Sequence, residues 1–153
     1  MEKNSIAAVS IRPARKGDDV AIQCLLRLAE LPSEDVSEHL ETFLVAVAVV
    51  GGEIVGTVGL EVTGSSGLLR SLAVAVPLRG IGLGKLLYGE IVEKARSLGI
   101  QRLGLLTTTA EGFFARVGFE KEKRSDIPPF IALSKEYKIY CPSTAVVMTK
   151  TIG

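Results

Sequence analysis

The sequence has little of what builds a metal centre or a disulfide framework. Its 153 residues include two cysteines and one histidine. Cys24 and Cys141 lie far apart, and neither has a second ligand at metal-binding spacing. We therefore expect reduced thiols and no metal site. His39 lies within the segment SEHLE, a pattern that favours an exposed helix face over a catalytic role.

The chain also lacks an excess of charge of one sign and a long unbroken apolar run. Its formal net charge is +1, and no local basic patch stands out, so we expect no nucleic-acid partner. The longest apolar run, residues 43–60, is interrupted by Gly51, Gly52 and Glu53, which indicates two strands and a turn rather than a membrane span. The first ten residues show no secretory pattern. We therefore expect a cytoplasmic protein with no membrane association.

The apolar content is sufficient for one hydrophobic core. Hydrophobic residues make up 47% of the chain and charged residues 23%, which is a globular composition. A chain of 153 residues is long enough for one domain of ordinary size and too short for two. We therefore expect a single domain over residues 1–153, with a small molecule as the more probable kind of ligand.

Hydrophobic periodicity predicts strands and helices that alternate in the second half of the chain. The predicted strands cover residues 9–15, the hairpin 43–62, 68–76, 102–108 and 143–150. The first predicted helix begins at Asp18 or Asp19 and ends before Pro32. Three further helices are predicted over residues 33–43, 84–97 and 110–118. The stretch from Lys121 to Pro142 shows no clear pattern. This order of elements indicates an α/β or α+β fold, with a central mixed sheet flanked by helices.

Three glycines at alternate positions, Gly80, Gly82 and Gly84, separate a predicted strand from a predicted helix. Such a turn presents backbone N–H groups with no side chains in the way, and the helix dipole adds positive potential, which suits phosphate or pyrophosphate. Arg79 and Lys85 would add positive charge. The spacing fits neither a Walker loop nor a dinucleotide-binding fingerprint. A tight turn without a ligand is the alternative.

The segment RGIGLG, which follows SLAVAV, fits the pattern Arg/Gln-x-x-Gly-x-Gly/Ala. Here the sequence resembles the GNAT family of acyl-CoA-dependent N-acyltransferases, and the resemblance covers nearly the whole chain in the correct order. The other matching segments are the opening strand and helix at residues 10–26, the central hairpin at 51–60, and the short helix with its Gly-Phe ending at 110–119. Residues 111–119 and 130–150 also look like a bacterial subgroup associated with arsenic-resistance operons.

The resemblance implies transfer of an acetyl group from acetyl-CoA to a primary amine, without a metal. The pyrophosphate would bind the backbone of residues 79–85, and the pantetheine arm would lie along the strand edge near Val74, because its two amides can pair with an edge as a strand would. A backbone N–H near Val74 would polarise the thioester carbonyl. The implied cofactor-binding residues are Leu72, Ala73, Val74, Arg79, Gly80, Ile81, Gly82, Leu83, Gly84, Lys85, Thr107 and Phe114.

The reaction removes a proton from the amine and releases a thiolate that can take one up. Phe114 lies where many relatives have a tyrosine that protonates the leaving thiolate. Either the thiolate leaves unaided, or Tyr137, Tyr140 or Cys141 donates the proton. For the general base we expect Glu61, at the end of a strand near the opening of the sheet. A solvent-facing strand end is the alternative for Glu61.

The acceptor is less well defined by the sequence. Arg70 and Arg124 are candidates to attract a carboxylate on a small-molecule amine, and Ser71 is a weaker site candidate that also fits a strand residue facing a helix. Two other functions stay open: acetylation of a protein N-terminus or lysine, and a non-catalytic acyl-CoA-binding regulatory module, which Phe114 would suit. A homodimer also stays open.

Overall fold

The computed structural model describes residues 8–139 and 143–153, and its strands form one seven-stranded mixed sheet flanked by helices. The strand order is β1-β2-β3-β4-β5-β7-β6. The chain divides into two compact units, and β3 and β4 contribute residues to both. The first unit contains the residues up to Leu60 and Ser71–Lys94, and the second contains Glu61–Arg70 and Ala95–Gly153. The mixed α/β fold predicted from the sequence is confirmed.

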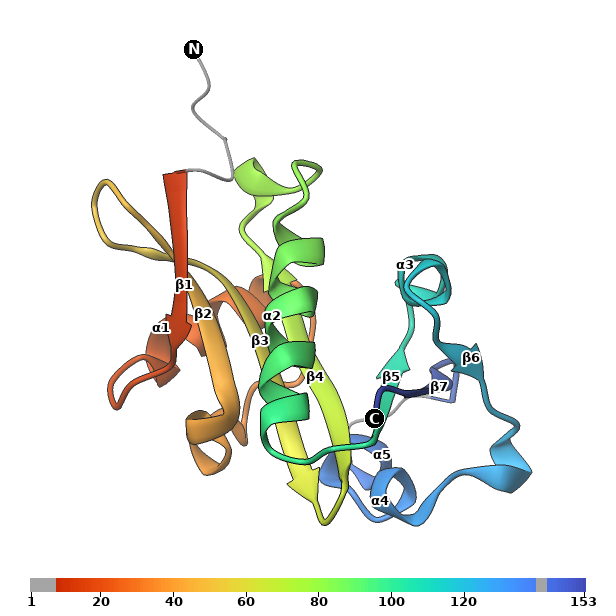
Figure 1. Ribbon diagram of the computed structural model, residues 1–153. Coiled ribbons are helices and arrows are strands. Elements are labelled where there is room, and N and C mark those ends of the chain that lie inside the picture. The colour runs from red at the N-terminus through yellow and green to blue at the C-terminus, as the bar shows by residue number, and fades with distance from the viewer. Residues whose placement is uncertain (1–7, 140–142) are drawn as a thin grey trace. The chain divides into compact units, whose positions relative to one another are not determined.

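The first three strands pair antiparallel, as their alternating sequences predict. They are β1 (Val9–Pro13), β2 (Phe43–Ala48) and β3 (Ile54–Thr63). Gly51 and Gly52 form the turn between β2 and β3, with φ angles of +93° and +73°, which glycine adopts without a Cβ clash. Figure 1 shows β3 continuing into β4 (Ser66–Val74) as a long hairpin.

Helix α1 (Asp19–Leu28) covers one face of β2. Its apolar residues Ile22 and Leu26 are buried in one cluster with Phe43 and Val45. Phe43 and Val45 are two positions apart on β2, so their side chains lie on the same face of the strand. This helix has the start that the sequence predicts. Of the apolar residues predicted to share its buried face, Ile22, Leu25 and Leu26 are buried, whereas Val20 and Leu28 are exposed.

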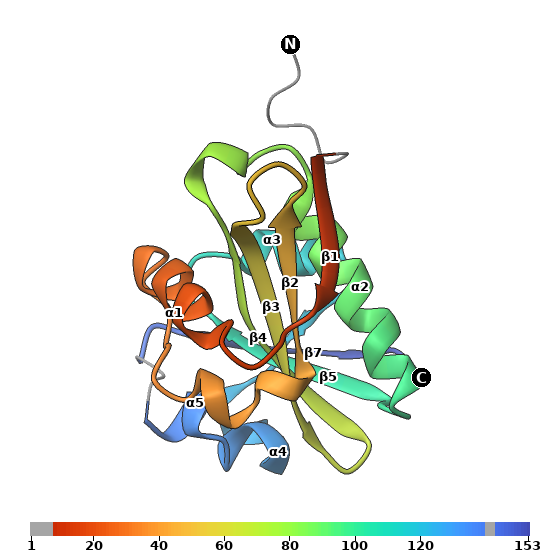
Figure 2. The ribbon, with the colours of Figure 1, turned by 90° about the vertical axis from the view of Figure 1, so that its left-hand side faces the viewer.

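Helix α2 (Leu83–Ser97) covers the other face of the same strands, as Figure 2 shows. It packs closely at Gly56 of β3, where an added Cβ would lie 3.0 Å from Leu87 Cδ1 and 3.2 Å from the Cβ of Ala46. Ala46 alternates with the residues that face α1, so α1 and α2 lie on opposite faces. Within the described part of the chain, no helix has the length and apolar character to cross a membrane.

The helix predicted over residues 33–43 is wrong. This stretch contains two 3₁₀ turns, η2 (Val36–Glu38) and η3 (Leu40–Thr42). The hydroxyl of Thr42 lies 3.0 Å from the carbonyl oxygen of His39 and also contacts the carbonyl of Leu60. Such side-chain bonds to the backbone compete with a regular helix.

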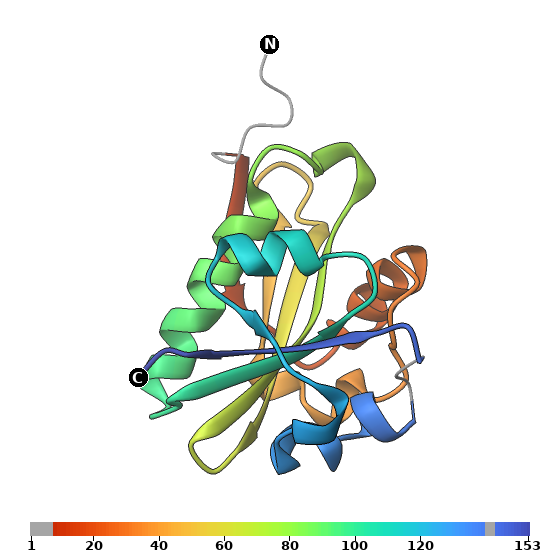
Figure 3. The same cartoon turned by 90° about the vertical axis from the view of Figure 1, so that its right-hand side faces the viewer.

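In the second unit, residues Ser66–Leu68 of β4 pair in parallel with Arg102–Gly104 of β5 (Arg102–Thr107). This confirms the parallel pair that the strand–helix–strand order predicts. β7 (Val146–Thr151) pairs antiparallel with β5 and with β6 (Glu120–Lys121), as Figure 3 shows. α3 (Glu111–Arg116) lies between β5 and β6 in the chain.

The stretch that the sequence left unassigned forms three short helical elements. These are η5 (Arg124–Asp126), α4 (Pro129–Ala132) and α5 (Lys135–Lys138). α4 packs on β5 so closely that a Cβ added at Gly104 would lie 2.4 Å from Ile131 Cδ1. Ile131 is buried together with Leu68 and Val147. Tertiary packing therefore holds elements that are too short for intrinsic helix propensity to specify.

Candidate active site

The glycine loop connects β4 to α2 through one 3₁₀ turn, η4 (Val76–Leu78). Gly80 and Gly82 have φ angles of +85° and +91°, in the left-handed region that glycine enters at little cost. The strand-to-helix turn predicted from the sequence is confirmed at these two positions.

Gly84 does not need to be glycine for its backbone angle or for packing. A Cβ at Gly84 would meet only Val74 Cγ2, at 4.0 Å, and a Cβ at Gly80 would meet nothing within 4 Å. The space beside the loop backbone is therefore open. No side chain outside the neighbouring residues occupies the position of a Cβ at Gly80 or Gly84.

The start of α2 supplies donors to that open space. The helical ladder begins with the N–H of Leu86, which donates to the carbonyl of Gly82 at 3.0 Å. The N–H groups of residues 83–85 precede this bond, and an α-helix offers its first N–H groups no internal acceptor. Lys85 is exposed and adds a positive charge. Backbone donors, helix dipole and lysine together fit a pyrophosphate.

The side chain of Arg79 is anchored to the backbone at the end of β4, and its contact with the phosphates stays a prediction. Its Nε donates a hydrogen bond of 2.9 Å to the carbonyl oxygen of Val74.

The backbone groups of Val74 can be placed from those of the next residue. Ala75 N–H donates to the carbonyl of Val55 on β3 at 2.8 Å. Because consecutive residues of a strand direct their N–H and C=O groups to opposite edges, those of Val74 point away from β3. Val74 also lies beyond Leu68, where the ladder with β5 ends.

β4 is irregular at Ser71. This residue is 8% exposed, and its φ of +61° is in the left-handed region, which costs a non-glycine residue about 1–2 kcal/mol. Such a residue interrupts the alternation of a strand, as a β-bulge does. Ser71 belongs to a strand, as the sequence predicts, but no pattern in the sequence indicated its positive φ. Its role in the site stays a prediction.

The predicted site residues divide between the two units. Leu72–Val74 and the loop of residues 79–85 belong to the first unit. Glu61, Thr107, Phe114 and Tyr137 belong to the second.

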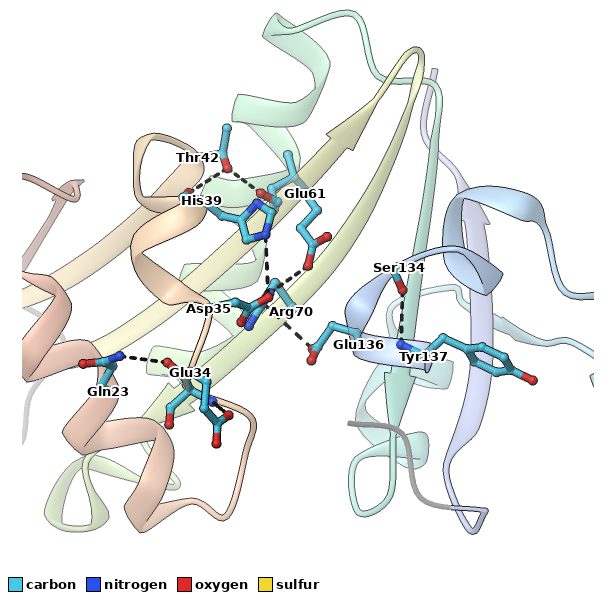
Figure 4. A network of polar contacts seen from close by, with 12 residues as sticks. Gln23, Glu34, Asp35, His39, Thr42, Glu61, Arg70, Ser134, Glu136 and Tyr137 are labelled. Atoms are coloured by element: carbon cyan, nitrogen blue, oxygen red, sulfur yellow. Dashed lines mark hydrogen bonds and ion pairs between the residues drawn. The ribbon is translucent and has the colours of Figure 1, made fainter. Parts of the chain in front are cut away.

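A buried ion cluster contains Glu61 in the second unit (Figure 4). The side chain of Arg70 is 0% exposed, and its Nη1 donates to Glu61 Oε2 at 2.7 Å. The Nε of Arg70 lies 3.9 Å from Glu136 Oε1. Glu61 and Glu136 are 15% and 12% exposed. The expectation that Arg70 attracts an acceptor carboxylate is therefore wrong, because this guanidinium is enclosed and faces two carboxylates of the protein.

Tyr137 points away from this cluster in Figure 4. Its hydroxyl accepts a hydrogen bond of 3.3 Å from Arg124 Nη1, and the Arg124 guanidinium carbon lies 5.4 Å from the centre of the Tyr137 ring. The Nη2 of Arg124 donates to the carbonyl of Ala145 at 2.6 Å. Arg124 thus binds the protein itself. Tyr140 and Cys141 lie outside the described residues.

Thr107 and Phe114 organise the connection between β5 and α3. The Oγ1 of Thr107 accepts a hydrogen bond of 2.9 Å from the N–H of Ala110. Phe114 is 5% exposed and makes edge-to-face contacts with Phe113 and Phe119, at centroid distances of 5.1 and 5.5 Å. Both residues thus have a structural role, and their contact with the cofactor stays a prediction.

His39 is half-buried rather than exposed. Its Nε2 lies 3.6 Å from Asp35 Oδ2, and the Asp35 side chain is 1% exposed. The sequence prediction of an exposed helix face is wrong because no α-helix forms here, and the 3₁₀ turns direct the ring toward Asp35.

Sequence reasoning missed Glu136. It lies on α5, where the side-chain oxygen of Ser134 accepts a hydrogen bond of 3.2 Å from the N–H of Tyr137. A serine directly before KEYK is an N-cap signal, and it could have indicated the helix. Nothing local could have paired Glu136 with Arg70 of β4.

Comparisons with known proteins identify the family to which this fold belongs. Residues 13–119 match the family described as "Acetyltransferase (GNAT) family". The "Amino-acid acetyltransferase" of Neisseria meningitidis serogroup A is 31% identical over 131 residues, which cover 80% of this chain and 30% of that protein. This chain thus spans about a third of the length of that curated relative.

Two solved structures are similar over most of the chain. N-acetylglutamate synthase from Neisseria gonorrhoeae, complexed with coenzyme A and N-acetyl-glutamate, has a TM-score of 0.81 and 27% identity, covering 95% of this chain and 35% of that one. Rv2747 from Mycobacterium tuberculosis, in complex with CoA, has a TM-score of 0.77 and 26% identity, covering 93% of this chain and 98% of that one.

Proposed function

Because this chain belongs to the acetyltransferase (GNAT) family, we propose that it transfers an acetyl group from acetyl-CoA to the amino group of a small amino acid. The observation that carries the proposal is the glycine loop, where open space beside Gly80 and Gly84 meets the first N–H groups of α2. A relative named amino-acid acetyltransferase and a similar structure holding CoA and N-acetyl-glutamate support this acceptor class.

The residues of the loop bind the cosubstrate through its phosphates. The backbone N–H groups of residues 83–85 and the charge of Lys85 hold the pyrophosphate at the positive end of α2. The edge of β4 at Val74 pairs with the pantetheine amides, and its N–H polarises the thioester carbonyl. Thr107 and Phe114 contact the same cosubstrate in this proposal. No residue of the protein needs to form a covalent bond.

The chain also moves one proton. Acetyl-CoA supplies a thioester whose carbonyl carbon the neutral amine attacks, so that an N–C bond forms and the C–S bond breaks. Glu61 accepts the proton that the amine loses, and holding both substrates in place provides the rest of the acceleration. The thiolate leaves unaided, or it takes a proton from Tyr137, Tyr140 or Cys141. The Tyr137 hydroxyl accepts a hydrogen bond from Arg124 and so keeps its own proton to donate, whereas Phe114 has none.

Incubation with acetyl-CoA and a panel of amines tests the function, with release of free CoA as the readout. We expect turnover with free amino acids and little with peptides that offer a lysine or an N-terminus. Turnover with peptides alone would indicate a protein acetyltransferase. Binding of acetyl-CoA without turnover across the panel would indicate a regulatory module instead.

Arg79→Ala should weaken binding of the phosphate end of acetyl-CoA without weakening binding of its pantetheine end. We expect the KM for acetyl-CoA to rise about tenfold, because a charged partner of the phosphates is lost. We expect the KM for S-acetyl-pantetheine, which has no pyrophosphate, to stay unchanged or fall, because the Val74 carbonyl is released from Arg79 Nε. Steady-state rates with both thioesters check this.

The matched control for Arg79→Ala is Lys94→Ala. Lys94 lies on α2, the helix that follows the loop, but beyond its first turns, and its Nζ donates to the Glu41 carbonyl at 3.3 Å. It should change neither KM. Equal weakening of both thioesters by Arg79→Ala would show that Arg79 acts only by holding the loop in shape.

Further expectations concern the domain organisation, the location, the oligomeric state and the biological role of the protein. A single domain over residues 1–153, a cytoplasmic location and a homodimer stay predictions. An arsenic-resistance role stays a prediction from the resemblance of residues 111–119 and 130–150 to that subgroup.

A further inference from the structure

Arg70 is the most completely enclosed charge in the ion cluster of the second unit. Its side chain is 0% exposed, and a buried guanidinium is tolerated only when it is paired and hydrogen-bonded. Because Arg70 is shut off from solvent, a ligand cannot reach it without moving other side chains. Arg70 therefore acts on a reaction through residues that it contacts, which include Glu61 and Glu136.

The two carboxylates are held by different atoms of the guanidinium. Nη1 makes a short charge-assisted hydrogen bond of 2.7 Å to Glu61, whereas Nε lies 3.9 Å from Glu136, which is ion-pair distance without a hydrogen bond. The guanidinium is planar and rigid. The position of Nε near Glu136 and the direction of the Nη1 hydrogen bond to Glu61 are therefore coupled.

Glu136 can act this way because α5 is fixed on two sides. At its start, Ser134 Oγ donates to the Ile131 carbonyl at 2.6 Å and accepts from the Tyr137 N–H. At the next residue after Glu136, the ring of Tyr137 is held by Arg124. Figure 4 shows Glu136 directed toward Arg70 and Tyr137 directed away from it, and Tyr137 contacts Arg124 instead. The carboxylate of Glu136 thus has a defined position.

We infer that Arg70 and Glu136 are positioning residues for Glu61, with Glu136 orienting the Arg70 guanidinium and Arg70 fixing the Glu61 carboxylate for proton acceptance. The inference rests on the proposed role of Glu61 as general base. It gives the contact between α5 and β4 a role in the rate of the reaction. Neither Arg70 nor Glu136 touches a substrate.

A double-mutant cycle between Glu61→Gln and Glu136→Gln tests the inference. We expect Glu136→Gln to lower kcat about tenfold with the KM for acetyl-CoA unchanged, because a misdirected base slows chemistry and not binding. In the Glu61→Gln background, Glu136→Gln should lower kcat by less than about twofold, because the Glu61 carboxylate that Glu136 helps to position has already been removed. Arg70→Lys should retain more activity than Arg70→Met.

Thermal unfolding and acetyl-CoA binding, measured on the same variants, exclude a general loss of fold. Lys138→Gln, an exposed change of charge on the same helix, should change neither kcat nor KM. If the two glutamate substitutions are additive in kcat, or Glu136→Gln leaves kcat unchanged while Glu61→Gln lowers it, the inference fails and Glu61 stays the base. If Glu61→Gln itself leaves kcat unchanged, the role of Glu61 fails first.

Discussion

Glu61→Gln should lower kcat by about a hundredfold or more, the usual contribution of a general base, and leave the Kd for acetyl-CoA within about twofold. Glutamine has nearly the shape of glutamate, and its amide oxygen can still accept the hydrogen bond from Arg70 Nη1. It cannot accept a proton from the attacking amine. Steady-state kinetics with one amino acid, together with calorimetric titration of acetyl-CoA, measure the two effects separately.

Glu120→Gln is the matched control, because Glu120 is an exposed carboxylate on a strand of the same unit. It should leave kcat, Kd and the unfolding midpoint unchanged. If Glu61→Gln keeps kcat within about threefold of wild type, Glu61 is not the base and lies at the strand end for structural reasons. Parallel loss of kcat, binding and unfolding midpoint would assign it to the fold.

Gly84→Val should raise the Kd for acetyl-CoA at least tenfold without lowering the unfolding midpoint. In the free protein a Cβ at Gly84 meets only Val74 Cγ2, at 4.0 Å, and valine is a better helix former than glycine. A valine side chain would fill the space through which phosphates approach the backbone of α2. Stability and affinity should therefore change independently, or in opposite directions.

Gly89→Val is the control, because Gly89 lies on the same helix and an added Cβ there would meet nothing within 4 Å. It should leave acetyl-CoA affinity unchanged. Gly82 is a poorer test, since its φ of +91° makes any side chain strained. A folded Gly84→Val protein whose Kd stays within about twofold of wild type would refute the phosphate site.

Features set by neighbouring residues are those that the sequence predicted well. The glycine loop, the Gly51–Gly52 turn and most of the apolar faces of α1 and α2 depend on backbone freedom and on periods of a few residues, both visible in a single sequence. Val20, Leu28 and Leu86 are exceptions, since they fit the period but are exposed. Residues 33–43 show a helical period too. The period was misleading there because the Thr42 hydroxyl bonds backbone carbonyls. Such bonds compete with the backbone bonds of an α-helix, and hydrophobic periodicity does not reveal them.

The chemistry of the candidate site was harder to predict where partners are distant in sequence. Arg70 was expected to face a substrate, yet it pairs with Glu61 and with Glu136, which is 66 positions further along the chain. No local pattern distinguishes an arginine that binds a ligand from one buried between two carboxylates. The hydrogen-bond partner of Arg79 could not be predicted either, although it is close in the sequence. That partner is a backbone carbonyl, which every residue has and which therefore carries no sequence signal.

The left-handed backbone at Ser71 also determines which mutations the middle of β4 can accept. Valine, isoleucine and threonine are the residues that strands usually favour, but their branched Cβ fits worst at a positive φ. Glycine, asparagine and aspartate, which strands usually avoid, fit best there. In a library randomised at Ser71, the ranking of residues among folded clones should therefore be the reverse of the β-propensity scale, at this one position of an otherwise ordinary strand.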